Sequence, residues 1–93
     1  MQPEMTIDED GNKFWWLNNR IHREDGPAIE FADGSKEWYL NGEHHRTDGP
    51  AVEYADGHKE WWLDGYWISF EGWLKQATGL TDEEKVMFKL QYG

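Results

Sequence analysis

The sequence predicts a mainly β protein in which antiparallel β-hairpins repeat along one axis and two short helices cap the C-terminal end. The dipeptide Asp-Gly recurs at 10–11, 33–34 and 56–57, a constant step of 23 residues. A fixed period over most of a chain indicates a repeat architecture. After Gly65 the apolar pattern changes to helical spacing. With 93 residues the chain has room for a single domain.

Three segments aligned on Asp-Gly define the repeat unit: DGNKFWWLNNRIHREDGPAIEFA, DGSKEWYLNGEHHRTDGPAVEYA and DGHKEWWLDGYWISFEGWLK. We expect strands at KEWYL and AVEYA, because these stretches alternate and are rich in aromatic and β-branched residues. Asn41-Gly42 and Asp64-Gly65 are favoured in type I′ hairpin turns. Ala-Asp-Gly at 32–34 and 55–57 predicts a second tight turn with glycine at positive φ. Each unit is therefore expected to supply two strands and two turns in a meander.

A His-Arg-x-Asp-Gly-Pro-Ala phrase occurs twice, at 22–28 and 45–51. We expect Asp48-Gly49-Pro50 to form a turn before the strand 51–54, with Pro50 at a strand's first residue, where a missing N–H does least harm. In each copy the arginine can donate a charge-assisted hydrogen bond to the aspartate two residues later, which would close the loop. The expected pairs are Arg23 with Asp25 and Arg46 with Asp48.

Period-two alternation predicts two aromatic faces for the sheet. One face carries Trp15, Trp38 and Trp61 together with Leu17, Leu40 and Leu63. The other carries Trp16, Tyr39 and Trp62 next to Phe14, Glu37 and Glu60. A sheet with one buried face does not need the second stripe. Two explanations stay open: the helices or a second copy of the chain cover it, or it is an exposed row of anchors with a charged rim, as interfaces favour.

Residues 66–93 are expected to form the helical cap of the repeats at 10–65, since the last strand of an array needs protection. Ser69 can cap a first helix whose apolar positions are Phe70, Trp73, Leu74 and Ala77, with Gly79 at C′. Thr81 opens a capping box with Glu84. The apolar stripe expected on the second helix is Val86, Met87 and Leu90. A shorter N-terminal cap is expected at 3–8.

The period of 23, the W-x-L-N-G turn and the x-A-D-G-x-K-x-W phrase resemble the MORN repeat. The chain is more similar to the divergent MORN-variant repeats of small bacterial and bacteriophage proteins, which carry NG..HR.DGPA. The matching residues are Asn41-Gly42, His45-Arg46, 48–51, His22-Arg23 and 25–28. The resemblance covers 10–65 and departs at Asn19, where Gly is expected, and after Gly65. It implies β-hairpin repeats used as scaffolds or interaction surfaces, some labelled antitoxins, and no catalytic residues.

The net charge of −10 argues against direct nucleic-acid binding and against an anionic membrane surface. An acidic surface favours a partner with a basic surface, beside the simpler role of solubility. The absence of cysteine excludes disulfides and thiolate metal sites. The N-terminus MQPEMTIDED lacks a signal-peptide pattern, and a cytoplasmic location is expected, that of the bacterial host if the protein is phage-encoded.

Metal binding and catalysis are not expected. His44 and His45 are adjacent in a strand and should point to opposite faces, whereas a metal needs three or four converging ligands. The glutamates repeat by position, so nothing distinguishes an acid from a base. We therefore expect no enzyme activity, no cofactor and no metal site.

The function expected from the sequence is a protein-binding module, an inhibitor or adaptor of phage type that acts on a basic host protein involved in nucleic-acid handling or defence. Its expected binding residues are Trp16, Tyr39, Trp62, Glu37, Glu60 and His44, the last because its repeat mate is Ile21. One alternative is a small-ligand or nucleotide-signal sponge that uses His22, Arg23, His45 and Arg46. Another is a self-associating scaffold, for example a homodimer.

Overall fold

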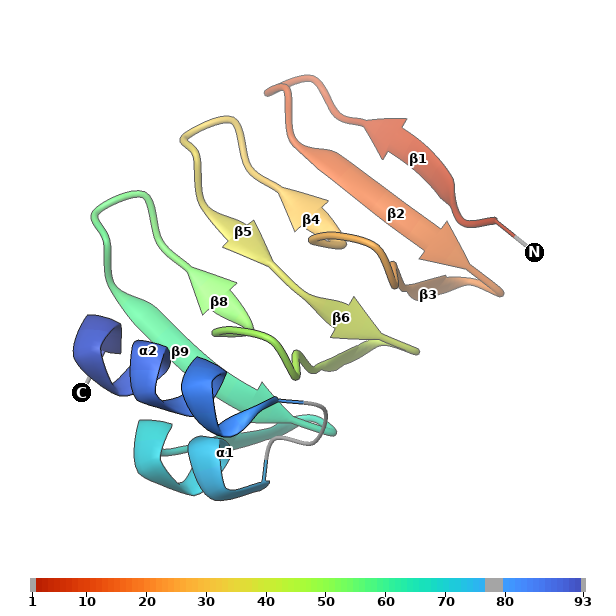
Figure 1. Cartoon of the computed structure of the whole chain (residues 1–93). Coiled ribbons are helices and arrows are strands. Elements are labelled where there is room, and N and C mark those ends of the chain that lie inside the picture. The colour runs from red at the N-terminus through yellow and green to blue at the C-terminus, as the bar shows by residue number, and fades with distance from the viewer. Residues whose placement is uncertain (1, 77–79, 93) are drawn as a thin grey trace.

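The computed structural model describes residues 2–76 and 80–92. Its main sheet runs in the order β1-β2-β4-β5-β8-β9-β10 with β3 beside β2, while β6 and β7 pair separately, and every pair is antiparallel (Figure 1). The elements are β1 Glu4–Ile7, β2 Lys13–Leu17, β3 Arg20–Ile21, β4 Ile29–Glu30, β5 Lys36–Glu37, β6 Tyr39–Leu40, β7 Glu43–His44, β8 Val52–Glu53, β9 Lys59–Leu63, β10 Tyr66–Ile68, α1 Phe70–Gln76 and α2 Asp82–Tyr92. The predicted antiparallel meander with two C-terminal helices is confirmed.

The hairpin turns have the backbone conformation that their dipeptides predict. Asn41 and Gly42 have φ values of 52° and 81°, and Asp64 and Gly65 have 51° and 82°. Two positive φ values in succession define the type I′ turn. Asn18 and Asn19 adopt the same turn at 51° and 63°, because asparagine tolerates this region better than other side chains. The departure from Gly at position 19 therefore leaves the fold unchanged.

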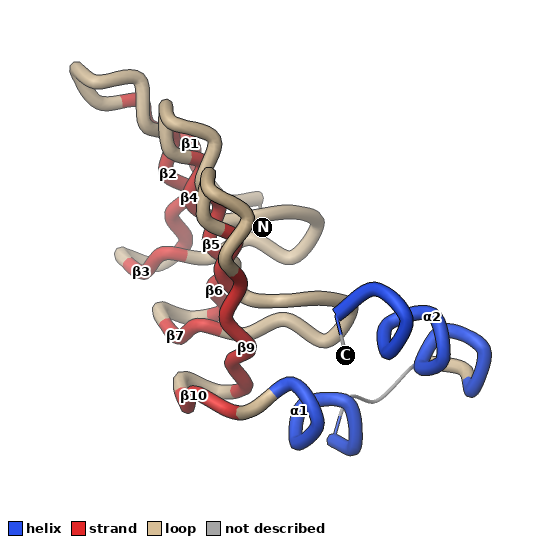
Figure 2. Tube along the Cα trace, turned by 90° about the vertical axis from the view of Figure 1, so that its left-hand side faces the viewer, coloured by secondary structure: helices blue, strands red, loops and turns tan. Residues whose placement is uncertain are grey.

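Each repeat unit contains more strand segments than the two we expected. The expected strand KEWYL divides at Trp38 into β5 and β6, because Trp38 N donates to Ala51 O and Trp38 O accepts from His45 N. A short return strand, β3, β7 or β10, follows each type I′ turn. These return strands bend to the side of the sheet away from the helices, and the loops of the His-Arg phrase project to the helix side (Figure 2).

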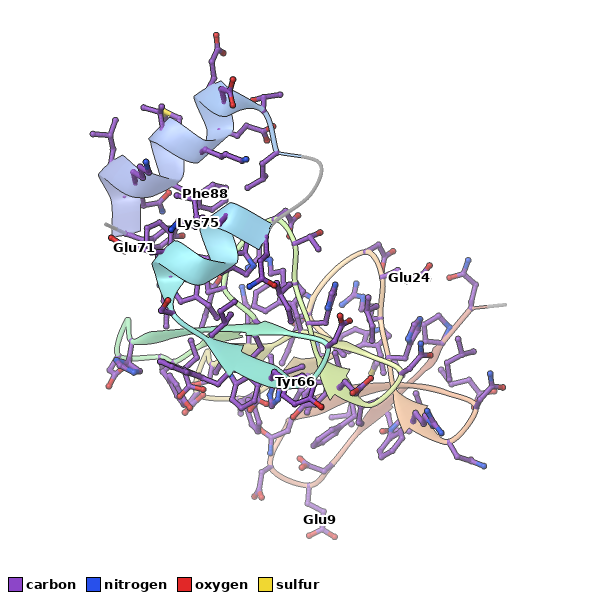
Figure 3. The ribbon with its side chains drawn as sticks, turned by 90° about the horizontal axis from the view of Figure 1, so that it is seen from below. Glu9, Glu24, Tyr66, Glu71, Lys75 and Phe88 are labelled. Carbon is purple, nitrogen blue, oxygen red and sulfur yellow. The ribbon has the colours of Figure 1, made fainter. Side chains whose placement is uncertain are left out.

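The helices pack on the face of the sheet that carries Trp61. Trp61, Trp73 and Leu74 form the buried cluster, and Phe70, Phe88 and Tyr92 surround it. Figure 3 shows Phe88 between the two helices. The capping helices therefore do not cover the stripe of Trp16, Tyr39 and Trp62, and this explanation for the stripe is wrong.

Both predicted helix caps are present, but the second helix packs through a different stripe. Ser69 Oγ accepts from Gly72 N at 3.1 Å, and Thr81 and Glu84 form the reciprocal capping box at 2.9 and 3.1 Å. The expected stripe is wrong because Val86, Met87 and Leu90 are exposed. Phe88 and Tyr92 face the core instead, where they contact the ring of Trp61. Ala77 and Gly79 lie outside the described residues.

The N-terminal end of the sheet is closed by β1, which pairs along its whole length with β2. The short cap expected at 3–8 is therefore a strand. Neither of the two helices in the described part of the chain is long and apolar enough to cross a membrane.

Candidate functional site

Cross-strand register separates the charges of the sheet onto two faces, because directly opposed residues share a face. The row Phe14, Ile29, Glu37, Val52 and Glu60 consists of successive partners, and we call its side the open face. The alternate row is Lys13, Glu30, Lys36, Glu53 and Lys59 on the other side. The helices pack on this side at the β9 end of the sheet, and we call it the helix face.

The two arginines of the repeated phrase are held on the helix face by aromatic rings and carboxylates. The guanidinium carbons of Arg23 and Arg46 lie 4.0 and 3.8 Å from the ring centroids of Trp15 and Trp38. Their Nη1 atoms donate to Glu30 and Glu53 at 3.3 and 2.9 Å. Their Nε atoms donate to Asp25 and Asp48 at 3.1 and 2.8 Å, which confirms the predicted loop-closing pairs.

The glycine of the Asp-Gly-Pro turn makes room for this guanidinium. A Cβ at Gly49 would lie 2.6 Å from Cζ of Arg46, and a Cβ at Gly26 would lie 3.1 Å from Cζ of Arg23. Because the guanidinium is fixed by several hydrogen bonds, it cannot move aside freely. The sequence indicated a turn at this glycine, and only the structure shows the arginine that packs on it.

His22 and His45 have structural roles between repeat units. His22 Nδ1 accepts from Asn41 N at 2.9 Å, and His45 Nδ1 accepts from Asp64 N at 3.0 Å. Each histidine thus binds the hairpin turn of the next unit. Arg23, His45 and Arg46 line a groove between the two loops, but His22 lines a separate hollow. The structure therefore does not bring the four proposed nucleotide ligands to one site, and all four make contacts within the fold.

The six predicted partner-binding residues all lie on the open face. His44 lies between two of them, with its ring centroid 4.1 Å from that of Tyr39 and 4.8 Å from that of Trp62. Its Nε2 is 2.7 Å from Glu37 Oε1, and the Tyr39 hydroxyl donates to the same oxygen at 2.9 Å. Trp16, whose unit has Phe14 in place of the glutamate, donates its indole N–H to Thr6 at 3.0 Å instead.

The second carboxylate of the open face is held by two aromatic donors. Glu60 accepts from the indole N–H of Trp62 and from the hydroxyl of Tyr54, each at 3.0 Å. Tyr54 and Trp67 belong to this face and were missed in the sequence. Trp67 pairs with Trp62 and is 64% exposed. The alternation from Val52 to Tyr54 could have identified Tyr54, whereas Trp67 lies beyond the regular repeat.

The hydrogen bonds on the open face fix the ionisation of its groups. The hydrogen bond from His44 lowers the pKa of Glu37, and the Tyr39 hydroxyl adds to this effect. Burial and the Glu37 carboxylate raise the pKa of Tyr39, and the hydrogen bond to Glu60 raises the pKa of Tyr54. Glu37 is therefore anionic at neutral pH, and both tyrosines are neutral donors.

The chemistry of this face is anionic charge set among aromatic rings, an arrangement suited to holding cationic groups. His44 packs on Tyr39 on the open face, whereas His45, the residue after β7, lines the groove between the two loops on the other side. Within residues 2–76 and 80–92, no three histidine, aspartate or glutamate side chains are grouped so that they could hold a metal ion. Comparison with models of known protein families, with curated proteins and with solved structures gives no match to the chain.

Proposed function

We propose that the protein is a binding module whose open face binds a protein partner with a basic surface. The observation that carries this proposal is the arrangement of Trp16, Tyr39 and Trp62 around Glu37 and Glu60 on the sheet face opposite the helices. Aromatic side chains are enriched in interfaces, and rings held in place lose little entropy on binding. The proposal also keeps the MORN-like interpretation, with a role as an inhibitor or adaptor of a basic host protein.

The distribution of basic residues supports this partner chemistry. The lysines and arginines of the sheet lie on the helix face, and the remaining three, Lys75, Lys85 and Lys89, are on the helices. A basic partner would therefore meet carboxylates on the open face without like-charge repulsion. Self-association through this face is less favourable, because two copies would bring Glu37 and Glu60 against the same carboxylates.

The proposal is tested by affinity capture with the full chain as bait and quantitative mass spectrometry. The test variant carries Glu37→Gln and Glu60→Gln, which remove two charges but keep an acceptor oxygen for the aromatic donors. We expect it to retain less of a specific partner, and we expect capture by the wild type to fall as salt rises.

The matched control carries Glu71→Gln and Glu83→Gln. These two glutamates are exposed on α1 and α2, on the helix side of the sheet, and the control has the same net charge as the test variant. The control should capture as much partner as the wild type. Equal loss in the two variants would show a general charge effect and contradict a role for the open face.

A nucleotide-binding function receives less support. The guanidiniums of Arg23 and Arg46 are each already paired with two carboxylates. A phosphate would have to displace these pairs. A thermal-shift screen with nucleotides tests this alternative, since a ligand that binds the native state raises the melting temperature.

A further inference from the structure

We propose that the partner's anchoring groups are arginine side chains, held at two stations on the open face. The Glu37 station consists of Glu37, Tyr39 and His44, and the Glu60 station consists of Glu60, Trp62 and Tyr54. The inference rests on the proposed function and specifies the chemistry that the open face recognises.

The helix face shows which group this protein places between an aromatic ring and a glutamate. Arg46 lies over Trp38 and donates to Glu53, and Arg23 repeats the arrangement with Trp15 and Glu30. Each guanidinium stacks on an aromatic ring and at the same time donates a hydrogen bond to a glutamate. The open face repeats the same two components, a ring and a glutamate, in the same repeat units.

Among the residues that the structure describes, the open face lacks the arginine that completes the arrangement on the helix face. Donors other than lysine and arginine hold its carboxylates: a tyrosine hydroxyl and the His44 imidazole at Glu37, and a tyrosine hydroxyl and an indole N–H at Glu60. In the described part of the chain, no lysine or arginine pairs with Glu37 or Glu60. These hydrogen bonds orient both carboxylates. The Glu37 carboxylate also lies 2.7 Å from the imidazole of His44, whereas tyrosine and indole donors alone hold Glu60.

Arginine fits this chemistry better than lysine. A guanidinium is planar, stacks on aromatic faces and donates to a carboxylate in a fixed fork, whereas an ammonium is a strongly hydrated point charge. The backbones of Glu37 and Glu60 are separated by two inter-strand spacings, about 10 Å, because both residues are cross-strand partners of Val52. Two arginines of one partner can therefore bind together, and their linkage would strengthen binding.

The test compares an octa-arginine with an octa-lysine peptide at equal ionic strength, each titrated into the ¹⁵N-labelled full chain. We expect the arginine peptide to bind about fivefold more tightly, in line with a cation–π contribution on the order of 1 kcal/mol. The chemical shifts that move should be those of the Trp62 indole N–H and of the backbone amides of Tyr39, His44 and Tyr54.

The Glu37→Gln, Glu60→Gln variant should lose the preference for arginine, and the Glu71→Gln, Glu83→Gln control should keep it. If both peptides bind the open face equally well, the assignment to arginine is wrong and the proposed function stands. If the arginine peptide moves signals only on the helix face, the stations are wrong. If neither peptide perturbs the open face, both the inference and the proposed function are contradicted.

Discussion

Glu37 and Glu53 belong to the same repeat unit and lie on adjacent strands, where Glu37 is opposite Val52 and Glu53 is opposite Lys36. The two carboxylates nevertheless have different surroundings. Glu53 faces the helix side and forms an ion pair with Arg46 at 2.9 Å. Glu37 faces the open side and accepts from Tyr39 and His44. At the scale of the residue, the face that a side chain occupies decides whether its carboxylate is paired with an arginine or is held by tyrosine and histidine donors.

Glu37→Gln should destabilise the protein at pH 7 by about 1 kcal/mol, because the hydrogen bonds from Tyr39 and His44 would then end on a neutral amide oxygen instead of a carboxylate. The folded-state pKa of Glu37 lies below its ordinary value of 4.5. The ionised carboxylate therefore stabilises the fold above pH 4.5, and this contribution is lost as the pH falls through the lowered folded-state pKa. Urea denaturation followed by tryptophan fluorescence at pH 7 and pH 3 measures the effect.

The difference in unfolding free energy between wild type and Glu37→Gln should thus shrink from pH 7 to pH 3, because protonated glutamate and glutamine are both neutral. Glu71→Gln serves as the control for loss of an exposed carboxylate. A difference that stays constant over this pH range would contradict the role assigned to the ionised Glu37.

At the scale of the element, the repeat array ends where three positions of the repeat carry different residues. Ile68 stands where His45 binds the next hairpin, and Ser69 stands where Arg46 covers a tryptophan. Ser69 instead caps α1, and the aromatic side chains of α1 and α2 take over the covering of Trp61. Trp73, in the position of Pro50, donates its indole N–H to Arg46 O at 2.8 Å and so ties the cap to the preceding unit.

Phe88→Ala should cost about 3 kcal/mol of stability, because Phe88 contacts the rings of Trp61 and Trp73 and its loss leaves a cavity. Leu90→Ala is the matched control on the same helix. Leu90 is 79% exposed, so its truncation should change stability by less than about 0.5 kcal/mol. Thermal denaturation followed by circular dichroism distinguishes the two variants. An equal loss in both would show that α2 packs through the Val86, Met87 and Leu90 stripe.

At the scale of the whole molecule, the fold is a stack of units joined by repeated contacts. Besides the bonds of His22 and His45, Ala32 N donates to Asn12 Oδ1 at 2.8 Å and Ala55 N donates to Ser35 Oγ at 2.9 Å. The histidine bonds join one unit to the next, whereas the bonds of Ala32 and Ala55 tie the end of a unit to the first turn of the same unit. Such nearest-neighbour contacts make the stability of an array depend on the number of units.

Insertion of a second copy of residues 33–55 after Ala55 should give a longer and more stable protein. The additional unit repeats the existing contacts and should lengthen the molecule by about 10 Å, the width of two strands. A gain of about 1 kcal/mol would raise Tm by roughly 5 °C for a domain of this size. Small-angle scattering and thermal denaturation measure the two effects.

The control for this insertion is the same copy with its histidine and arginine, the equivalents of His45 and Arg46, replaced by alanine. It should fold with a lower Tm than the intact insertion, because it lacks the bond to the next hairpin turn and the cover of its tryptophan. An intact insertion that unfolds at a lower temperature than the parent chain would show that an added unit does not stabilise the array.

Local information determined the repeat period, the turns, the Arg–Asp loop pairs and the helix caps, because each depends on residues close together in the sequence. It also placed Trp16, Tyr39, Trp62, Glu37 and Glu60 together on one face, since alternation along a strand is a local property. Only the tertiary structure decided that the helices cover Trp61 and leave this face open. That choice depends on how the aromatic residues of α1 and α2 fill space against one side of the sheet, and packing between distant segments is not encoded in any local pattern.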